Sequence, residues 1–392
     1  MLSKKTFFSI KLTLLLLFPV QSTSIFAAVR PYGIFDSGVS LINNGHLNSI
    51  SLTSGTGTAA RLGVRGNETI NASLSAEFLI ETFITMDDGS NYGMESIYNS
   101  ATFVGFNYKE FVDFFDAKAE FSIRLGRQRS ILHDRLYLYD PMRQNLIGSP
   151  TGFAMYSMFY NKMIKMVAKI RKNKETTIFR FMFIPGNYNE SLKEQYLTIG
   201  DSHKKTPFGT WGVSARWDKK PFSIKTGYQI EKKTSFREQN DSFLSVIRYS
   251  ISHIDFYGGY LRRSPGRQIF LSGEENIKTE CFYLGFGMPL KKLLPDFNVN
   301  SSIYFSYAHP KMKSLIKLEG GTMLTEQNYF AHQWGIGIKK PLSKKTALYF
   351  FAGEIQNSIK SKFSLEAIPY DIPSALAGGN PSVIGFSLNQ RY

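Results

Sequence analysis

The chain has 392 residues, a formal net charge of +16 and a single cysteine, Cys281. One cysteine excludes an intrachain disulfide and a metal cluster built from cysteines. A strongly basic chain suits nucleic acid, an anionic surface or a cavity that attracts anions. The six histidines are widely dispersed, and there is no nucleophile elbow, phosphate loop or dinucleotide fingerprint. The sequence therefore gives no argument for catalysis, and we expect no metal and no cofactor.

The first residues form a basic and then apolar segment. Three lysines, at positions 4, 5 and 11, precede an apolar run at residues 12–18, and the small residues Ala27 and Ala28 follow it. This order is typical of a secretory signal peptide, and the apolar run is well short of the roughly 20 residues of a spanning helix. We predict a signal peptide at 1–27 and one domain at 28–392. Cleavage removes three lysines and no acidic residue, which lowers the net charge from +16 to +13. Export argues against nucleic acid as a partner.

Strict two-residue alternation is the main pattern from residue 30 onward. Segments such as 72–81, 211–217, 222–231 and 297–307 place apolar side chains on one face and polar side chains on the other. A soluble β-sandwich also alternates, but here the polar faces mix Gly, Ser and Asn with Arg, Lys and Glu, as a water-filled lumen would. Aromatic residues make up 15% of the chain and gather at segment ends, which suits the two interfaces of a bilayer. The pattern predicts a transmembrane β-barrel.

Breaks between the alternating segments come in two sizes. Short polar breaks at 65–69 and 339–346 predict periplasmic turns. Longer charged breaks predict external loops; they lie at 86–99, 187–207, 231–241 and 262–278. With a strand and its connection taking about 23 residues, the exported chain accommodates about 16 strands.

The longest break runs from about residue 130 to 162. It contains Asp134, Asp140 and several Gly and Pro residues, followed by an aromatic and Met-rich stretch at 153–160. A connection of this length inside a tight meander is usually functional. Asp134 and Asp140 also have a simpler interpretation as caps of turns, since Asp before Pro often starts a turn.

The chain ends in a strand pattern that stops on an aromatic residue. Ile384, Phe386, Leu388 and Tyr392 fall on one face, interrupted only by Gln390. An apolar band that ends on an interfacial aromatic is typical of a lipid-facing barrel strand. We predict that these four apolar side chains face lipid.

Four landmarks, in order along the chain, resemble the general porins of Gram-negative outer membranes, specifically the trimeric, 16-stranded kind of neisserial and other β-proteobacterial envelopes. The first is Tyr32–Gly38 and the second is Ala60–Glu68, which is similar to the family hairpin Ser-Arg-Leu-Gly-Phe-Lys-Gly-x-Glu. The third is Phe103–Phe106 followed by Leu125–Gln128. The fourth is Pro341–Tyr349, similar to the family turn and strand Leu-Ser-Lys-Arg-Thr-x-Leu-Tyr.

The chain also departs from the family pattern. It ends on Tyr392 rather than Phe, it has fewer glycines after Glu68, and Asn99–Ser100 replaces an arginine pair that is common in the family. These changes leave the fold expectation intact and affect the expected lining of the pore.

The resemblance implies an all-β, 16-stranded antiparallel barrel whose third loop, about 130–162, folds inward. Asp134 and Asp140 would then face a ladder of basic residues on the wall, and opposed charges there would create a transverse field. Arg61 matches the arginine of the family hairpin. Tyr392 would belong to the signal that the outer-membrane assembly machinery reads.

Alternation by itself selects further wall residues. Arg61 and Arg65 share one parity, and Arg124 and Arg180 lie on the polar sides of their strands. Arg65 lies beside the predicted turn, which favours the periplasmic rim over the constriction for this residue. Glu77 and Glu81 have the parity to face the same interior, so Arg61 could pair with either one without setting selectivity. The candidate pore-lining residues are Arg61, Arg65, Glu77, Glu81, Arg124 and Arg180.

These observations together predict an outer-membrane porin that lets small hydrophilic solutes and ions diffuse, with a preference for anions. The expected partners are two further copies in a homotrimer, outer-membrane lipid and lipopolysaccharide, and the barrel-assembly machinery. Three alternatives stay open: a barrel enzyme such as a lipid hydrolase or protease, a substrate-specific anion channel, and a surface adhesin.

Overall fold

The computed structural model describes most of the chain after the predicted signal peptide. The described residues are 28–91, 99–112, 116–143, 148–153, 158–185, 209–232, 239–264, 274–294, 300–317, 324–363 and 377–392. The predicted signal peptide at 1–27 and the predicted loop at 187–207 lie outside the described residues. No helix in the described part of the chain has the length and apolar character to span a membrane.

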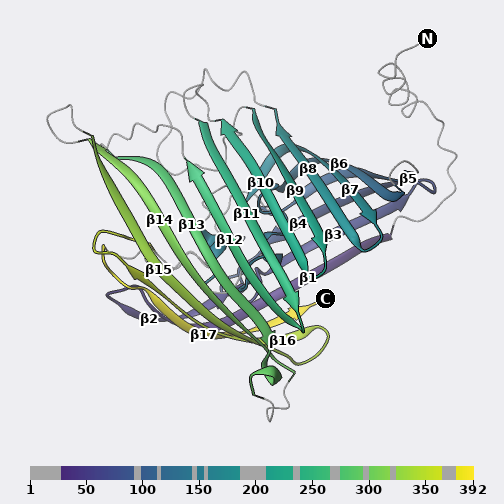
Figure 1. The fold of residues 1–392 in the computed structure, drawn as a ribbon. Helices are drawn as coiled ribbons and strands as arrows, with labels where there is room; N and C mark the ends of the chain where they lie inside the picture. The colour runs from purple at the N-terminus through teal and green to yellow at the C-terminus, as the bar shows by residue number, and fades with distance from the viewer. Residues whose placement is uncertain are drawn as a thin grey trace.

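Strands make up nearly all of the described structure, and every pairing between them is antiparallel (Figure 1). The strands are β1 (Ala28–Asn43), β2 (Asn48–Ser54), β3 (Arg61–Thr69), β4 (Leu74–Phe83), β5 (Thr102–Val112), β6 (Ala117–Arg129), β7 (Phe159–Lys172), β8 (Glu175–Ile184), β9 (Thr210–Lys219), β10 (Phe222–Lys232), β11 (Gln239–Ile251), β12 (Ile254–Ser264), β13 (Glu274–Pro289), β14 (Ser302–Lys317), β15 (Leu324–Pro341), β16 (Thr346–Asn357) and β17 (Ser382–Arg391).

The first and last strands close the sheet into a barrel. β1 pairs with β17 from Ile34 opposite Arg391 to Asn43 opposite Ser382. The terminal Tyr392 extends this seam, because its N–H donates to the carbonyl of Gly33 at 2.9 Å. The other edge of β1 pairs with β3 along its first half and with β2 along its second half.

β2 and β3 therefore share one position in the wall, so the seventeen strands fill sixteen positions. This arrangement confirms the predicted 16-stranded antiparallel barrel. The break between the two, at residues 55–60, is stabilised by β1: the Gly57 N–H donates to the Asp36 carboxylate at 3.0 Å, and the Gly55 N–H donates to the Asp36 carbonyl at 2.9 Å. One aspartate thus replaces the ladder hydrogen bonds that the break removes.

Most short turns lie at the end of the barrel where β1 begins, and most long connections lie at the other end; the longer connection between β13 and β14, at 290–301, lies at the turn end. The turn after β3 lies at 70–73, where the Asn71 side chain accepts the N–H groups of Ser73 and Leu74 at 2.9 and 2.8 Å. The turn after β15 lies at 342–345. The predicted break at 65–69 is therefore placed too early, because the β3–β4 ladder continues to Thr69. The predicted break at 339–346 contains the observed turn but is too wide, because the β15–β16 ladder continues to Pro341.

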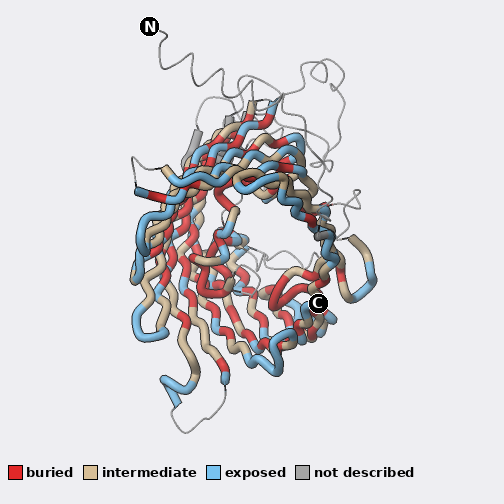
Figure 2. The backbone as a smooth tube through the Cα atoms, turned by 90° about the vertical axis from the view of Figure 1, so that its right-hand side faces the viewer, coloured by how far each residue is buried: buried red, intermediate tan, exposed pale blue. Residues whose placement is uncertain are grey.

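Burial alternates along the strands, as Figure 2 shows. In β17, Ile384, Phe386 and Leu388 are 56%, 48% and 41% exposed, whereas Ser387 and Asn389, on either side of Leu388, are buried. Tyr392 is also exposed on the apolar side. The predicted lipid-facing side of the last strand is confirmed by this alternation.

The connection between β6 and β7, residues 130–158, is here called the third loop, and its described residues lie against the inner wall. It carries two short 3-10 helices, η2 (Leu136–Leu138) and η3 (Pro150–Phe153). The Tyr139 hydroxyl lies 2.8 Å from the hydroxyl of Ser223 on β10, the Tyr283 hydroxyl of β13 donates to the Tyr139 carbonyl at 2.9 Å, and Ser306 of β14 donates to the Gly148 carbonyl at 2.7 Å. The wall partners have the inward parity of their strands, so these contacts place the loop on the lumen side.

The tight pairing of β1 with β17 leads to a first prediction. A side chain at Gly38 would place its Cβ 2.0 Å from the Phe386 carbonyl oxygen, so Gly38→Ala must push β1 away from β17. We expect Gly38→Ala to lower the free energy of unfolding by about 1–3 kcal/mol, the usual effect of overpacking. The shift of the urea-unfolding midpoint measures the loss.

Gly258→Ala is the matched control. Gly258 is also a strand glycine, and its added Cβ would meet its nearest neighbour, a Leu284 methyl, at an ordinary 3.4 Å. Equal stability of the two variants would contradict a tight seam at Gly38.

Candidate functional site

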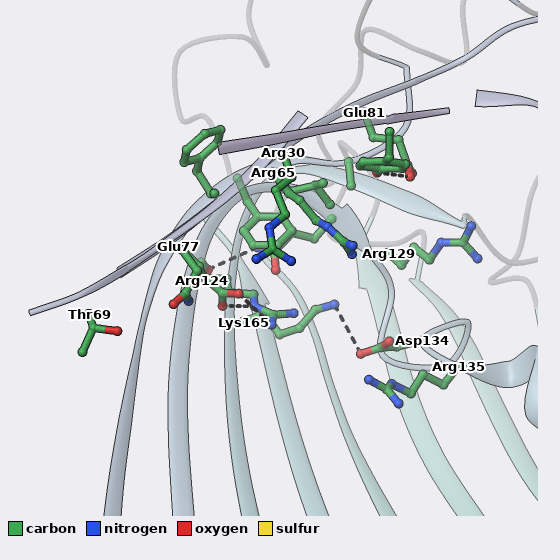
Figure 3. A pocket seen from close by; sticks show the side chains of 18 residues that line it. Arg30, Arg65, Thr69, Glu77, Glu81, Arg124, Arg129, Asp134, Arg135 and Lys165 are labelled. Carbon is green, nitrogen blue, oxygen red and sulfur yellow. Dashed lines mark hydrogen bonds and ion pairs between the residues drawn. The ribbon is translucent and has the colours of Figure 1, made fainter. Parts of the chain in front are cut away.

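A space of about 850 Å³ lies inside the barrel between the third loop and the wall formed by β1 and β3 to β7 (Figure 3). Three acidic residues line it, namely Glu77, Glu81 and Asp134. Six basic residues line it as well: Arg30, Arg65, Arg124, Arg129, Arg135 and Lys165. Six cations and three acids leave a net charge of +3 around this space.

The two glutamates of the wall are paired with arginines. Arg124 donates from its Nε to Glu77 at 2.7 Å, and Arg61 lies 3.6 Å from Glu81. Glu81 also accepts the Tyr32 hydroxyl at 2.5 Å. Each glutamate therefore neutralises one predicted pore arginine.

Glycines on the intervening strands allow these pairs to form. Glu77 of β4 and Arg124 of β6 both lie opposite Gly105 of β5, and a Cβ at Gly105 would lie 2.9 Å from the Arg124 side chain. Gly63 of β3 has the same role between Tyr32 and Glu81. Long side chains can cross the middle strand because a glycine there leaves room above the backbone.

Four further arginines, Arg65, Arg129, Arg135 and Arg30, have no carboxylate within ion-pair distance in the part of the chain that the structure describes. Arg65 lies over the ring of Tyr32 at 5.4 Å and Arg129 lies over the ring of Phe159 at 5.1 Å. Arg135 is exposed on the loop, where its φ is 58°. Stacking orients the first two guanidinium groups and leaves their charge uncompensated.

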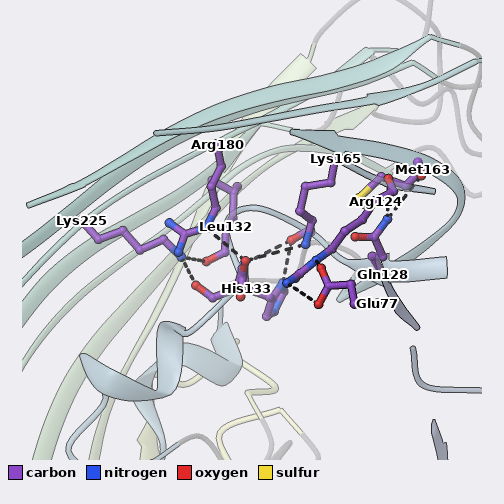
Figure 4. A network of polar contacts seen from close by, with 11 residues as sticks. Glu77, Arg124, Gln128, Leu132, His133, Met163, Lys165, Arg180 and Lys225 are labelled. Atoms are coloured by element: carbon purple, nitrogen blue, oxygen red, sulfur yellow. Dashed lines mark hydrogen bonds and ion pairs between the residues drawn. The ribbon is translucent and has the colours of Figure 1, made fainter. Parts of the chain in front are cut away.

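Asp134 links the base of the third loop to the wall. Lys165, Arg180 and Lys225 of the wall converge there, beside Leu132 of the loop (Figure 4). The Asp134 carboxylate lies 3.1 Å from the Arg180 Nε and 3.7 Å from the Lys165 Nζ. Lys225 donates to the carbonyls of Leu132 and Asp134, both at 2.7 Å. Lys165, Arg180 and Lys225 are at most 5% exposed, so these cations are held in protein rather than in water.

The electrostatic setting keeps Asp134 ionised and His133 neutral. Burial raises the pKa of the Asp134 carboxyl, but Lys165, Arg180 and Lys225 outweigh it and hold the pKa well below its usual range. Burial, with Arg129 and Lys225 nearby, lowers the pKa of His133 to about 3. The imidazole therefore adds no positive charge at neutral pH.

The two aspartates that sequence analysis placed in the constriction have different positions. Asp134 faces the lumen space, whereas Asp140 is fully buried. The Asp140 carboxylate accepts the Met142 N–H at 2.8 Å, the Thr151 hydroxyl at 2.7 Å and the Ser149 hydroxyl. Asp140 therefore holds the two halves of the loop together. The prediction that it faces the basic wall is wrong, because its carboxylate oxygens accept hydrogen bonds inside the loop.

The remaining predicted wall residues divide in a similar way. Arg65, Glu77, Glu81 and Arg124 line the lumen space, whereas Arg180 lies beneath the loop, where it binds Asp134. Arg61 reaches the site through its pair with Glu81.

Sequence analysis missed Arg30, Arg129, Arg135, Lys165 and Lys225. Lys225 has inward parity in its strand, which was a usable signal. Arg129 has the outward parity of its strand, so alternation did not select it; the β6–β7 ladder is irregular near it, with an extra residue in β7 between Tyr160 and Met163. Arg30 lies at the start of β1, where the pattern is short.

No family model matches the chain. The chain is 24% identical over 351 residues to outer membrane porin protein 32 of Delftia acidovorans, a match that spans 87% of each protein. It superposes on an anion-selective porin from Comamonas acidovorans with a TM-score of 0.71 at 20% identity, over 94% of this chain and 100% of that one. It superposes on Salmonella typhi OmpF in complex with daunomycin with a TM-score of 0.62 at 13% identity, over 93% and 97% of the two chains. These likenesses show a shared fold.

The anchoring of the third loop makes the second prediction. Lys225→Met removes the donor for two carbonyls of the loop, and an unsatisfied buried polar group costs about 1–3 kcal/mol. We expect amide hydrogens at 131–139 to exchange with solvent about tenfold faster or more, since ~1.4 kcal/mol corresponds to a factor of ten. Hydrogen exchange with mass spectrometry measures this change.

Lys219→Met is the matched control, since Lys219 pairs with Glu175 at an exposed turn. Unchanged exchange at 131–139 in the Lys225 variant would show that the loop is held without this lysine.

Proposed function

We propose that the chain is a porin in the outer membrane of a Gram-negative bacterium, through which small hydrophilic solutes and ions diffuse passively, with a preference for anions. The observation that carries the proposal is the lumen space with six cations and three acids inside a closed barrel. A surplus of fixed positive charge in a low-dielectric passage concentrates anions there and repels cations. The similarity to an anion-selective porin and to an outer-membrane porin over most of the chain supports it.

The lumen space has a surplus of positive charge, and it also has charges of opposite sign on its two sides. Arg65 and Arg129 project from the wall, while Asp134 projects from the loop on the other side of the space (Figure 3). Opposed charges across a narrow passage set up a transverse field that orients dipolar solutes and disfavours lipophilic ones. This field is the proposed basis of selection among small solutes.

An enzymatic function has less support. A serine–histidine contact does exist, with the Ser130 hydroxyl 3.3 Å from the His133 Nδ1. Both side chains are buried within the first turn of the third loop, in which the Ser130 hydroxyl also accepts the His133 N–H at 3.2 Å. A hydrolase needs a nucleophile that its substrate can reach, so we interpret this contact as part of the loop fold.

The homotrimer is also part of the proposal, and it rests on the resemblance to trimeric porins. One structure with a similar fold, at a TM-score of 0.60 and 11% identity, is OmpT of Vibrio cholerae in its trimer form. The mass of the purified protein in detergent tests this state.

Ion selectivity gives the third prediction. Arg65→Glu reverses a stacked, unpaired charge at the lumen and should lower the permeability ratio of chloride to potassium by about twofold or more. The reversal potential of planar bilayers in a KCl gradient measures the ratio. Lys291→Glu, an equal change on the exposed helix η4 (Leu290–Lys292), is the control.

Each outcome has a distinct meaning. No stepwise conductance from the wild-type protein would overturn the channel, and cation preference would overturn the anion preference. Equal shifts for the two variants would remove Arg65 from the selectivity set. Conductance that saturates with one anion and not with chloride would identify the substrate-specific alternative.

The terminal aromatic gives the fourth prediction. Tyr392 faces outward, its ring lies 6.0 Å from that of Phe35, and Lys345 lies over it at 5.4 Å. We propose that it is read by the barrel-assembly machinery. Deletion of Tyr392 should lower the amount of folded protein in the outer membrane at least severalfold, while Tyr392→Phe keeps it. Heat-modifiable gel mobility of membrane fractions measures folding, and normal assembly of the deletion would refute the proposal.

A further inference from the structure

A short row of side chains on the inner wall combines positive charge with apolar surface. Arg30 of β1 lies opposite Arg65 of β3. Arg65 lies opposite Leu79 of β4, which in turn lies opposite Phe103 of β5. All four side chains line the lumen space of about 850 Å³, where Figure 3 shows the two arginines beside each other. The row therefore presents two guanidinium groups at one end and two apolar side chains at the other.

The apolar end of this row lies in a wall that otherwise faces the lumen with polar groups. On the inward side of β4, Leu79 lies between Glu77 and Glu81, and all three line the same space. Leu79 and Phe103 are partly exposed, so the third loop does not bury them. Apolar surface in water is unfavourable, and a solute that covers these two side chains gains the free energy of burying it.

The charged end of the row is free to bind an anion. Neither Arg30 nor Arg65 has a carboxylate within ion-pair distance among the described residues. The guanidinium group of Arg65 lies over the ring of Tyr32 at 5.4 Å, and this stacking orients it. The wall glutamates on either side of the row already pair with other arginines. A carboxylate that enters the space can therefore accept hydrogen bonds from both arginines without displacing a protein carboxylate.

The two ends of the row are close enough for one small solute. Neighbouring strands lie about 4.8 Å apart, so Leu79 is one strand and Phe103 two strands from Arg65, a span of about 10 Å. Benzoate is a planar ring with a carboxylate at one edge. With its carboxylate at Arg65, its ring lies over Leu79 and reaches toward Phe103. Arg124 already lies over the ring of Phe103 at 4.9 Å, so this part of the wall accommodates contact between a guanidinium group and a ring.

We propose that this row binds aromatic carboxylates as they pass through the lumen. The carboxylate binds Arg30 and Arg65, and the aromatic ring lies on Leu79 against Phe103. The site rests on the proposed anion passage and selects among the anions that enter it. Because an aromatic carboxylate is charged, the transverse field orients it, whereas the field disfavours an uncharged lipophilic solute.

Other solutes fit the row less well. Chloride and acetate would contact the two arginines but would leave Leu79 and Phe103 in water. An uncharged aromatic solute would cover the apolar side chains but would leave the arginines without a counter-charge. A saturated ring has no π face to attract a guanidinium group. The row therefore favours a solute that is both anionic and aromatic.

The test measures how added anions block the chloride current of single channels in planar bilayers, with benzoate as the probe and acetate and cyclohexanecarboxylate as the comparisons. In the wild type, benzoate should halve the current at a concentration about tenfold lower than acetate does, because only benzoate buries its ring. Leu79→Ser should weaken the benzoate block about fivefold and the acetate block far less. Arg65→Gln should weaken both blocks, because it removes the anchor of the carboxylate.

Leu348→Ser is the matched control. Leu348 of β16 is also partly exposed, but it lies on the outer face, opposite Leu388 of β17. Benzoate should block this variant as it blocks the wild type. Stepwise conductance of each variant in KCl alone shows that its barrel is folded.

Failure of the site and failure of the channel give different results. No stepwise conductance, or a preference for cations, would overturn the proposed function. Anion-selective channels that benzoate and acetate block at the same concentration would overturn the site alone. Equal block of the wild type and of Leu79→Ser by benzoate would also overturn it. If cyclohexanecarboxylate blocks as strongly as benzoate does, the proposed preference for aromatic solutes is wrong.

Discussion

The constraint on which the structure depends is that a backbone in lipid must satisfy all of its hydrogen bonds internally. A sheet meets this requirement only when its edges are joined, and here the joint is the pairing of β1 with β17. The seam is tight at Gly38, where no side chain fits, and it extends to Tyr392 at the end of the chain. Closure also explains why the break between β2 and β3 is possible: Asp36 of β1 accepts the hydrogen bonds that the missing ladder would have formed.

Closure gives each strand an inner face toward the aqueous lumen and an outer face toward lipid, and the two faces carry different side chains. The inner face presents arginines whose charge is only partly balanced. Glu77 and Glu81 form ion pairs with Arg124 and Arg61, so they are not available to the other arginines. The third loop lies on the same inner surface, held by Lys225 and by Asp134. The outer one is apolar across its middle, where Ile247 and Leu284 are exposed, and it carries ion pairs such as Arg262 with Asp241 near the long connections. The same alternation thus produces a basic passage inside and a lipid-matched surface outside.

Sequence analysis predicted most of the fold and about half of the charged residues that line the lumen space. Alternation predicted the wall, its lipid face and the inward parity of Arg65, Glu77, Glu81 and Arg124. It placed Asp140 opposite the wall, whereas the structure buries that carboxylate in bonds with Ser149 and Thr151. Arg129 was missed because it has the outward parity of β6, yet it lines the lumen space beside the irregular end of the β6–β7 ladder. A residue's parity describes its own strand, and it contains no information about which loop atoms reach its side chain.

The sequence by itself determined the local properties of this protein: the strand pattern, the lipid-facing side, the surplus of positive charge and the ending on Tyr392. Each of these depends on neighbours along the chain, since side chains alternate with a period of two. Only the tertiary structure decided which charges are paired. Glu77 pairs with Arg124 across β5, where Gly105 leaves room for the two side chains. Asp134 pairs with Arg180 and Lys165 only because the third loop lies against the inner wall. These pairs join residues far apart in sequence, and the strand register and loop contacts that bring them together exist only in the closed barrel.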